Sequence, residues 1–177
     1  MLENKTILLG VCGCTPAGRA VDIATSLRSL GAEVKIIPTK NALNFVTPLM
    51  LQRASANPIQ IDQFDSPVIW DRTYQSWTLD GDLLLIAPAS ADMLGKLANG
   101  IADDLLSTNV LSFEGPKLIA MNMSPMLYRN AAVQRNVQQL AVDGYYFIDN
   151  HDSTNPCRMP SVDDVVNEIV DYFHDRD

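Results

Sequence analysis

Three short stretches of the sequence gather small and hydroxyl-bearing residues in a way that suits a bound anion and a flat ring. They are Gly10–Gly18, which reads Gly-Val-Cys-Gly-Cys-Thr-Pro-Ala-Gly, then Pro38–Asn41, and finally Ala87–Asp92. Glycines let the main chain approach an anion, and a following helix offers free N–H groups and the positive end of its dipole. These stretches indicate one extended ligand with a phosphate at one end. Ordinary turn chemistry of an α/β protein is the competing interpretation.

Few side chains in this sequence are suited to proton transfer or nucleophilic attack. The chain has three cysteines and two histidines. Cys157 is next to Arg158, whose charge favours a thiolate, so a reactive thiol and an idle buried one both stay open. Cys12 and Cys14 form no CxxC pair, and we predict packing roles for them and no metal site. His151 is either a solvated loop residue or a group that reaches the site.

Alternating apolar runs and helical periodicities predict the elements that position these residues. Each apolar run is short and continuous, as in strands buried on both faces. Proline is expected to divide one helix at Pro48 and to end the third strand at Pro88. The predicted strands are Thr6–Val11, Glu33–Ile37, Asp82–Ala87, Lys117–Met121 and Gly144–Ile148; the predicted helices are Arg19–Leu30, Ala42–Ala54, Met93–Ala98, Ala102–Val110, Ala131–Val142 and Val162–Phe173.

This alternation predicts an α/β fold with a doubly wound, mostly parallel sheet. Ligands of such sheets bind beyond the carboxyl ends of the strands, where the three stretches should meet. The 177 residues suit a single domain over 1–177, and a net charge of −8 argues against nucleic acid or an anionic membrane as partner. No signal peptide or membrane-spanning run is visible, so we expect a reduced, cytoplasmic protein.

Two blocks of the sequence resemble a known family. Pro88–Asp92 together with Lys96–Thr108 is similar to the signature of the homo-oligomeric flavin-containing cysteine decarboxylases, which include phosphopantothenoylcysteine decarboxylase and peptidyl-cysteine decarboxylases of lantibiotic biosynthesis. Met121–Met126, Met-Asn-Met-Ser-Pro-Met, resembles a second family block, although Ala120 precedes it. The resemblance implies a flavodoxin-like (Rossmann-like) three-layer fold, FMN as cofactor, and homotrimers that sometimes assemble into homododecamers.

The resemblance also assigns roles to individual residues. Asn122 would hold the carboxylate of a cysteine-terminated peptide or another small acidic substrate, with Met126, Arg158 and Met159 beside it. The family chemistry oxidises the thiol-bearing carbon with FMN, after which carbon dioxide leaves. The residues that would contact FMN are Gly13, Cys14, Thr15, Thr39, Phe45, Pro88, Ala89, Ser90, Asp92, Ser107 and Thr108.

The sequence departs from the family at two places. Tyr74 stands where the decarboxylases carry a histidine, and a tyrosine with a pKa of about 10 is a poor base. The segment Asn155–Pro160 is shorter than the family's substrate clamp, and its cysteine adjoins the arginine. We therefore expect an FMN-dependent cysteine decarboxylase with Asn122, Tyr74 and Cys157 as catalytic residues. The alternative is an FMN-binding member without that activity, serving as a regulatory or assembly subunit or as another flavin oxidoreductase.

Overall fold

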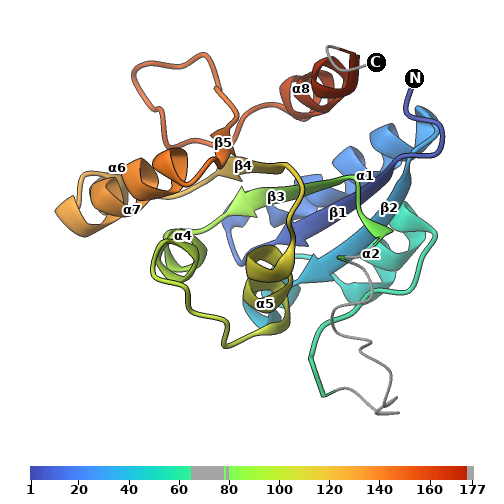
Figure 1. Ribbon diagram of the computed structural model, residues 1–177, viewed down its shortest axis with the longest axis horizontal. Coiled ribbons are helices and arrows are strands. Elements are labelled where there is room, and N and C mark those ends of the chain that lie inside the picture. Colours follow the sequence, from blue (N-terminus) through green and yellow to red (C-terminus); the bar gives the residue numbers. More distant parts are fainter. Residues whose placement is uncertain (65–77, 79, 175–177) are drawn as a thin grey trace.

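Five parallel strands form one sheet in the order β2-β1-β3-β4-β5 (Figure 1). The computed structural model describes residues 1–64, 78 and 80–174. The sheet order is that of the flavodoxin-like doubly wound fold, so the predicted fold class is confirmed. The strands are β1 (Thr6–Val11), β2 (Glu33–Pro38), β3 (Leu83–Ala89), β4 (Lys117–Met121) and β5 (Tyr146–Phe147).

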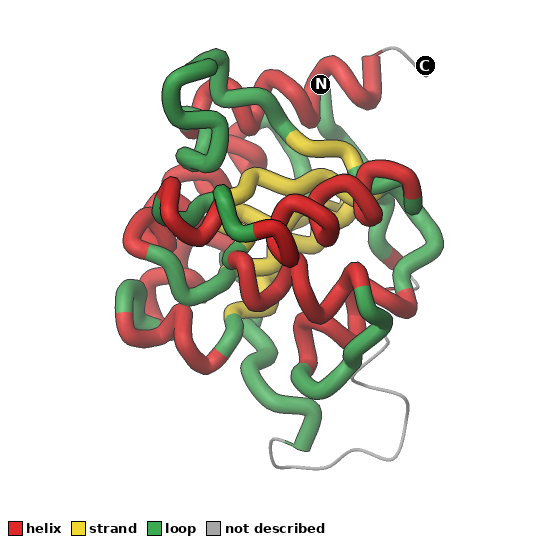
Figure 2. Tube along the Cα trace, turned by 90° about the vertical axis from the view of Figure 1, so that its left-hand side faces the viewer, coloured by secondary structure: helices red, strands yellow, loops and turns green. Residues whose placement is uncertain are grey.

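Helices cover both faces of the sheet, so the molecule has three layers (Figure 2). Side chains of a strand alternate between faces, and β1 accordingly sends Ile7 and Leu9 to one apolar core and Leu8 to the other. The first core is closed by α1, α2 and α8, the second by α4, α5 and α7. The helices are η1 (Thr15–Gly18), α1 (Arg19–Ser29), η2 (Lys40–Asn44), α2 (Pro48–Ser55), α4 (Ala91–Ala98), α5 (Leu105–Ser112), α6 (Pro125–Tyr128), α7 (Ala131–Val142) and α8 (Val162–His174).

The predicted end of the third strand at Pro88 was wrong, because β3 continues to Ala89. Proline cannot donate to a sheet ladder, and it is tolerated in strands chiefly at bulges. Here the register between β3 and β4 shifts between Ile86 and Ala89, which accommodates the missing N–H. The Pro88 carbonyl accepts a hydrogen bond from Cys12 N at 3.0 Å, and the Ala87–Pro88 peptide bond is cis. Pro48, in contrast, does separate η2 from α2 as predicted.

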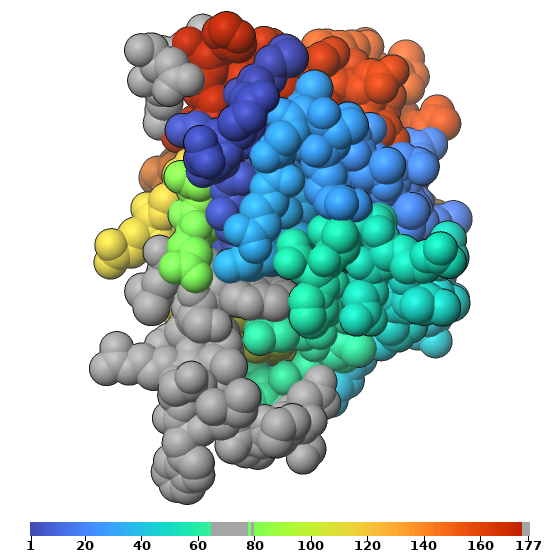
Figure 3. Space-filling view, turned by 90° about the vertical axis from the view of Figure 1, so that its right-hand side faces the viewer, coloured from blue at the N-terminus to red at the C-terminus, as the bar shows by residue number. Residues whose placement is uncertain are grey.

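The first residues of the chain pack against the last helix (Figure 3). Leu2 is fully buried, and Lys5 Nζ lies 4.9 Å from the centroid of the Phe173 ring. Lys5 immediately precedes β1, so this contact lies at the amino end of the sheet. The carboxyl ends of the strands, where a ligand is expected, lie at the other end. No helix among the described residues is long and apolar enough to cross a membrane.

Candidate functional site

The carboxyl ends of β1, β2 and β3 meet at a crevice of about 350 Å³. Parallel pairing sets Val11 opposite Pro38, and Gly10 opposite Ile86, so the segments that follow these strands leave the sheet side by side. The three stretches identified in the sequence therefore do converge. The crevice is lined by Gly13, Pro38, Thr39, Lys40, Asn41, Ile61, Asp62, Gln63, Phe64, Ser90, Asp92, Lys96, Asp103, Asp104, Leu105 and Leu106.

Two helices begin at this crevice with their first N–H groups capped by side chains. Ser90 Oγ accepts a hydrogen bond from Met93 N at 3.2 Å at the start of α4, and Asp104 Oδ1 accepts from Ser107 N at 2.8 Å at the start of α5. Asp104 also explains why α5 begins at Leu105, three residues later than predicted, since a capping aspartate favours extended backbone at its own position. The crevice thus receives the positive ends of two helix dipoles.

Gly13 permits the close approach that forms one wall of the crevice. A Cβ atom on this residue would lie 2.5 Å from Asn41 Cβ and 2.9 Å from the Asn41 main-chain oxygen. Only a hydrogen atom fits between the two loops. In contrast, a Cβ on Gly18 would meet no atom within 4 Å. The sequence identified the glycine-rich stretch as a whole, and the structure singles out Gly13 as its sterically required member.

Lys96 organises the acidic side of the crevice. Its Nζ lies 2.8 Å from Asp104, 3.0 Å from Asp103 and 3.5 Å from Asp92. Burial by itself raises the pKa of Asp104, but hydrogen bonds from Lys96 and Ser107 hold that pKa below its usual value. Burial likewise opposes the charge of Lys96, yet its hydrogen bonds with Asp104 and Asp103 raise the pKa of the ammonium. Sequence reasoning missed Lys96, although its i,i+4 spacing from Asp92 was available as a signal.

Asn122 lies just after β4 and is held in a fixed orientation. Its main-chain N donates to Ala89 O at 2.8 Å, and its side-chain Oδ1 accepts from Met159 N at 3.2 Å. The Nδ2 group makes none of the hydrogen bonds found between described residues, so both its protons stay available. Asn122 opens into a second cavity of about 550 Å³, here called the Asn122 cavity, lined also by Thr15, Pro16, Gly18, Arg19, Asp22 and Arg158.

Cys14 is buried between the crevice and the Asn122 cavity. Its thiol donates to the main-chain oxygen of Asn122 at 3.4 Å, and burial raises its pKa to about 11. Burial also raises the pKa of Cys12 to about 12. Both thiols are therefore protonated near neutral pH, in keeping with the packing roles predicted for them.

Cys157 is also buried, and its thiol donates to Asn155 Oδ1 at 3.1 Å. Its carbonyl accepts from Met123 N at 3.0 Å, which ties the loop before α8 to the segment that carries Asn122. Together with the bond from Met159 N to Asn122 Oδ1, this bond places Cys157, Arg158 and Met159 near Asn122. His151 in the same loop is exposed, with Nδ1 3.7 Å from Asp149.

Several predicted site residues lie outside the two cavities. The Phe45 and Met126 side chains are exposed, and Pro88 and Ala89 belong to the strand end itself. Ser107 is buried in the capping box with Asp104. Thr108 Oγ1 accepts a hydrogen bond at 2.7 Å from Nε2 of Gln63, which lines the crevice. Tyr74 lies outside the described residues.

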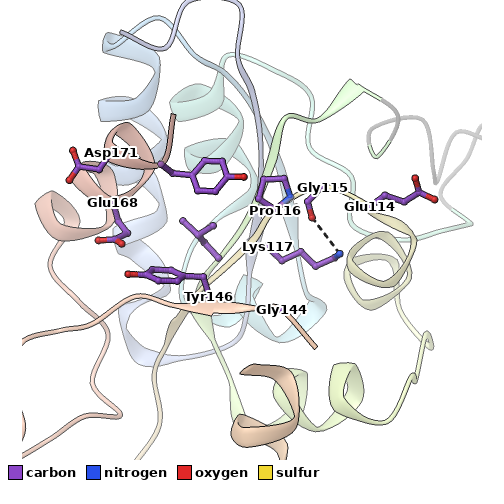
Figure 4. Close-up of a pocket in the computed structure, with 10 residues that line it drawn as sticks. Glu114, Gly115, Pro116, Lys117, Gly144, Tyr146, Glu168 and Asp171 are labelled. Carbon is purple, nitrogen blue, oxygen red and sulfur yellow. Dashed lines mark hydrogen bonds between the residues drawn. The ribbon is translucent and has the colours of Figure 1, made fainter. Parts of the chain in front are cut away.

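A larger cavity of about 750 Å³ lies at the amino ends of β4 and β5 and along α8 (Figure 4). Glu168 and Asp171 of α8, Tyr146 of β5 and Lys117 of β4 line it, and a hydrogen bond with Glu168 raises the pKa of Tyr146. This cavity contains none of the predicted site residues. It is also at the end of the sheet where ligands of this fold do not usually bind, so we place the functional site at the crevice and the Asn122 cavity.

Comparison with known proteins identifies related sequences and structures. The model of the family described as Flavoprotein matches residues 1–174. The coenzyme A biosynthesis bifunctional protein CoaBC of Bacillus subtilis (strain 168) is 39% identical over 160 residues, which cover 89% of this chain and 39% of that protein. The chain thus spans about two fifths of the length of this relative.

Solved structures extend the likeness over nearly the whole chain. The FMN-dependent cysteine decarboxylase SpaF is 28% identical, with a TM-score of 0.83 and coverage of 97% of this chain and 98% of that chain. A mutant form of a PPC decarboxylase is 22% identical with a TM-score of 0.85, covering 97% of this chain and 99% of that chain. At that lower identity the second likeness supports the fold alone.

Proposed function

The chain belongs to the Flavoprotein family, and we propose that it is an FMN-dependent oxidative decarboxylase acting on the carboxylate of a cysteine. The substrate class is a peptide with a carboxyl-terminal cysteine or phosphopantothenoylcysteine. A structural neighbour named as a cysteine decarboxylase and a relative named for coenzyme A biosynthesis support this assignment. The observation that carries it is the oriented amide of Asn122, whose Oδ1 is occupied by Met159 and whose N–H groups are free for a carboxylate.

The crevice fits a flavin phosphate ester in its chemistry. Gly13 leaves room where any side chain would collide, α4 and α5 direct the positive ends of their dipoles to the crevice, and Thr39 and Ser90 line its wall. Its volume lies within the range of small-molecule sites. We propose that Gly13, Cys14, Thr15, Thr39, Ser90 and Asp92 hold FMN, with Phe45, Pro88, Ala89, Ser107 and Thr108 around them. When bound, FMN accepts the two electrons released from the thiol-bearing carbon of the substrate.

The protein's part is to bind the carboxylate without stabilising its charge too strongly. As carbon dioxide departs, the negative charge leaves the carboxylate oxygens, so any interaction with that charge is weaker in the transition state than in the bound substrate. A neutral amide donor still orients the carboxylate, and its interaction with that group weakens less in the transition state than the interaction of a cation would. Asn122 meets this requirement. Met159, which is buried and fixes Asn122, and Met126 form the proposed apolar surroundings.

We propose Tyr74 and Cys157 as the remaining catalytic residues. Cys157 is near Asn122 through its bond to Met123. The presence of Tyr74 in place of the family's histidine favours a second candidate function, a flavin-binding protein without decarboxylase activity. The two candidates differ in whether a cysteine carboxylate is consumed.

Mass spectrometry of the reaction products distinguishes them. The flavin-loaded protein is incubated with a cysteine-terminated peptide and, separately, with phosphopantothenoylcysteine. If the peptide is the substrate, it should lose about 46 Da, which is carbon dioxide plus two hydrogens. If phosphopantothenoylcysteine is the substrate, it should lose about 46 Da, or about 44 Da where the reduced flavin returns its two electrons to the product. Asn122→Asp keeps the acceptor for Met159 N and replaces the Nδ2 donor by an anionic oxygen, so turnover should fall about 100-fold while flavin absorbance is retained. Asn167→Ala, on the exposed side of α8, is the control. Full activity in Asn122→Asp contradicts the carboxylate role.

We further propose that residues 1–177 act as one flavin-binding domain in the cytoplasm and assemble into a homotrimer or into a homododecamer built from four such trimers. Exposed apolar side chains follow the lining segments of both cavities along the chain, and they support self-association, since large exposed apolar groups commonly mark interfaces. Phe45 is the C-cap of η2, Leu49 and Met50 lie on α2, and Met126 and Leu127 lie on α6 just after Asn122. Light scattering of the protein as it elutes from a size-exclusion column measures the molar mass of the assembly. The mass of a monomer at micromolar concentration contradicts this part of the proposal.

A further inference from the structure

The Asn122 cavity holds two guanidinium groups that come from distant parts of the chain. Arg19 is the first residue of α1, and Arg158 lies in the loop before α8. Neither side chain makes an ion pair or a hydrogen bond among those found between the described residues. Asp22, one turn after Arg19 on α1, is the single carboxylate among the described lining residues. The lining residues therefore carry two positive charges against one negative charge, although the pKa of Asp152, outside the lining, is lowered by hydrogen bonds from Thr154 and also by the charge of Arg158.

The crevice has the opposite balance. Its two lysines face four aspartates, and each lysine is already paired: Lys96 with three of them and Lys40 with Asp62 at 2.5 Å. An anion in the crevice would therefore be held by helix N-termini and hydroxyl groups, whereas the two guanidinium groups of the Asn122 cavity are without an ion pair among the described residues. Arginine is well suited to that task, because its planar donors bind carboxylates and phosphates in pairs.

The departing carboxylate is a poor partner for these arginines. It loses its charge as carbon dioxide forms, so two cations bound to it would stabilise the substrate more than the transition state and slow the reaction. Asn122 already provides neutral donors for that group. An anion that keeps its charge throughout the reaction suits Arg19 and Arg158 better, and the cavity of about 550 Å³ is large enough for more than one carboxylate.

Resting on the function proposed above, we propose that Arg19 and Arg158 bind a second anionic group of the substrate, separate from the carboxylate that leaves. The class of ligand is therefore a cysteine derivative with a distal phosphate monoester or a distal carboxylate. This second anion contributes binding without taking part in the chemistry. It makes the two arginines determinants of substrate specificity.

The test compares substrates that differ only in the second anion. One pair is phosphopantothenoylcysteine and pantothenoylcysteine, and the other is a cysteine-terminated peptide with glutamate or glutamine before the cysteine. One of the two pairs corresponds to the protein's own class of substrate. For that pair, the wild-type kcat/KM should be higher for the member that carries the second anion. Arg19→Gln and Arg158→Gln should each lower kcat/KM about 10-fold for the anionic member and leave the neutral member unchanged. Arg19→Lys should retain part of the preference, and Arg135→Gln on the exposed side of α7 is the control.

Two results would overturn the inference. An equal loss for both members of each pair means that the arginines act on the departing carboxylate or on the fold. A weaker FMN affinity in Arg19→Gln and Arg158→Gln, with substrate preference unchanged, means that they bind the cofactor phosphate instead. If the wild type turns over no substrate, the proposed function fails, and binding of the unreactive serine analogues of the same pairs, followed by flavin fluorescence, still decides whether the arginines recognise the second anion.

Discussion

Replacing Lys96 by methionine tests the electrostatic design of the crevice. The substitution keeps most of the side-chain volume and removes the ammonium that lies within 3.5 Å of Asp92, Asp103 and Asp104. Three carboxylates are then left close together, with Asp104 partly buried. We expect Lys96→Met to destabilise the protein at pH 7, and the size of the effect follows from how exposed these groups are.

Breaking a fully buried ion pair costs about 3–5 kcal/mol, and breaking an exposed one costs about 1 kcal/mol or less. The Lys96 side chain is 18% exposed and that of Asp104 is 32% exposed, while Asp103 and Asp92 are 57% and 71% exposed. Only the bond to Asp104 thus approaches the buried limit. The expected loss is about 2 kcal/mol, which for a chain of this size lowers the melting temperature by about 4–8 °C.

The pH dependence gives the sign of the effect. In the wild type the pKa of Asp104 is lowered, so its stabilising contribution is present above the unfolded value of about 4 and is lost as pH falls through the folded value. Without Lys96, burial raises that pKa, and protonation relieves the strain between the carboxylates. The deficit of Lys96→Met relative to wild type should therefore shrink between about pH 5 and about pH 3.

Chemical unfolding of both proteins with excess FMN at pH 7, pH 5 and pH 3 measures the deficit. Lys35→Met is a matched control: Lys35 is 14% exposed, but its carboxylate partners, Asp80 and Glu33, are 3.6 and 4.0 Å away and largely in solvent. The free energy of unfolding of Lys35→Met should be lower than that of the wild type by less than about 1 kcal/mol. A deficit for Lys96→Met no larger than that of the control, or one that is constant with pH, refutes the reasoning.

Three further outcomes are expected from the same end of the sheet. Gly13→Ala should lower the free energy of unfolding by about 1–3 kcal/mol and weaken FMN binding, because its methyl group would lie 2.9 Å from the main-chain oxygen of Asn41. Gly18→Ala should change neither property, because a Cβ atom there meets no atom within 4 Å. Melting curves and flavin titration compare the two variants. Ser90→Ala should lose about 1 kcal/mol through its N-cap bond to α4, measured by urea unfolding, and no loss would show that the cap is replaced by water. Cys12 and Cys14 should resist iodoacetamide at pH 7.5 in the folded protein and react once it is unfolded, because burial raises their pKa values to about 12 and about 11; rapid labelling of either in the native state, seen by peptide mass mapping, contradicts this.

The strands were predictable because they are buried on both faces. A run such as Leu83–Ile86 needs apolar residues at every position, and that continuity is visible without any structure. Lys117–Met121 and Ala131–Val142 agree with the sequence to the residue. The end of β3 at Pro88 was missed because a bulge depends on how the neighbouring strand continues, which no local pattern records.

The candidate site was predictable in its parts and unpredictable in their grouping. Small residues at strand ends identify the crevice, because strand order and parallel pairing bring those ends together. The charge balance of each cavity depends instead on loops. Asp103 and Asp104 reach Lys96 only because the chain turns back after α4. Arg19 and Arg158 line one cavity only because the loop before α8 is tied to the Asn122 segment by the hydrogen bonds of Met123 N and Met159 N.

The segment after β1 contributes lining residues to both cavities. The protonation state of its Cys14 thiol affects whether anions can bind in them. Gly13 lines the crevice, Thr15 lines the Asn122 cavity, and Cys14 is buried between them with its thiol on the main-chain oxygen of Asn122. A thiolate at Cys14 would repel a carboxylate bound at Asn122 and would also oppose an electron-rich flavin. Burial prevents this by raising the pKa of Cys14 to about 11, so the Cys14 thiol is neutral at the pH where the carboxylate of the proposed substrate is ionised.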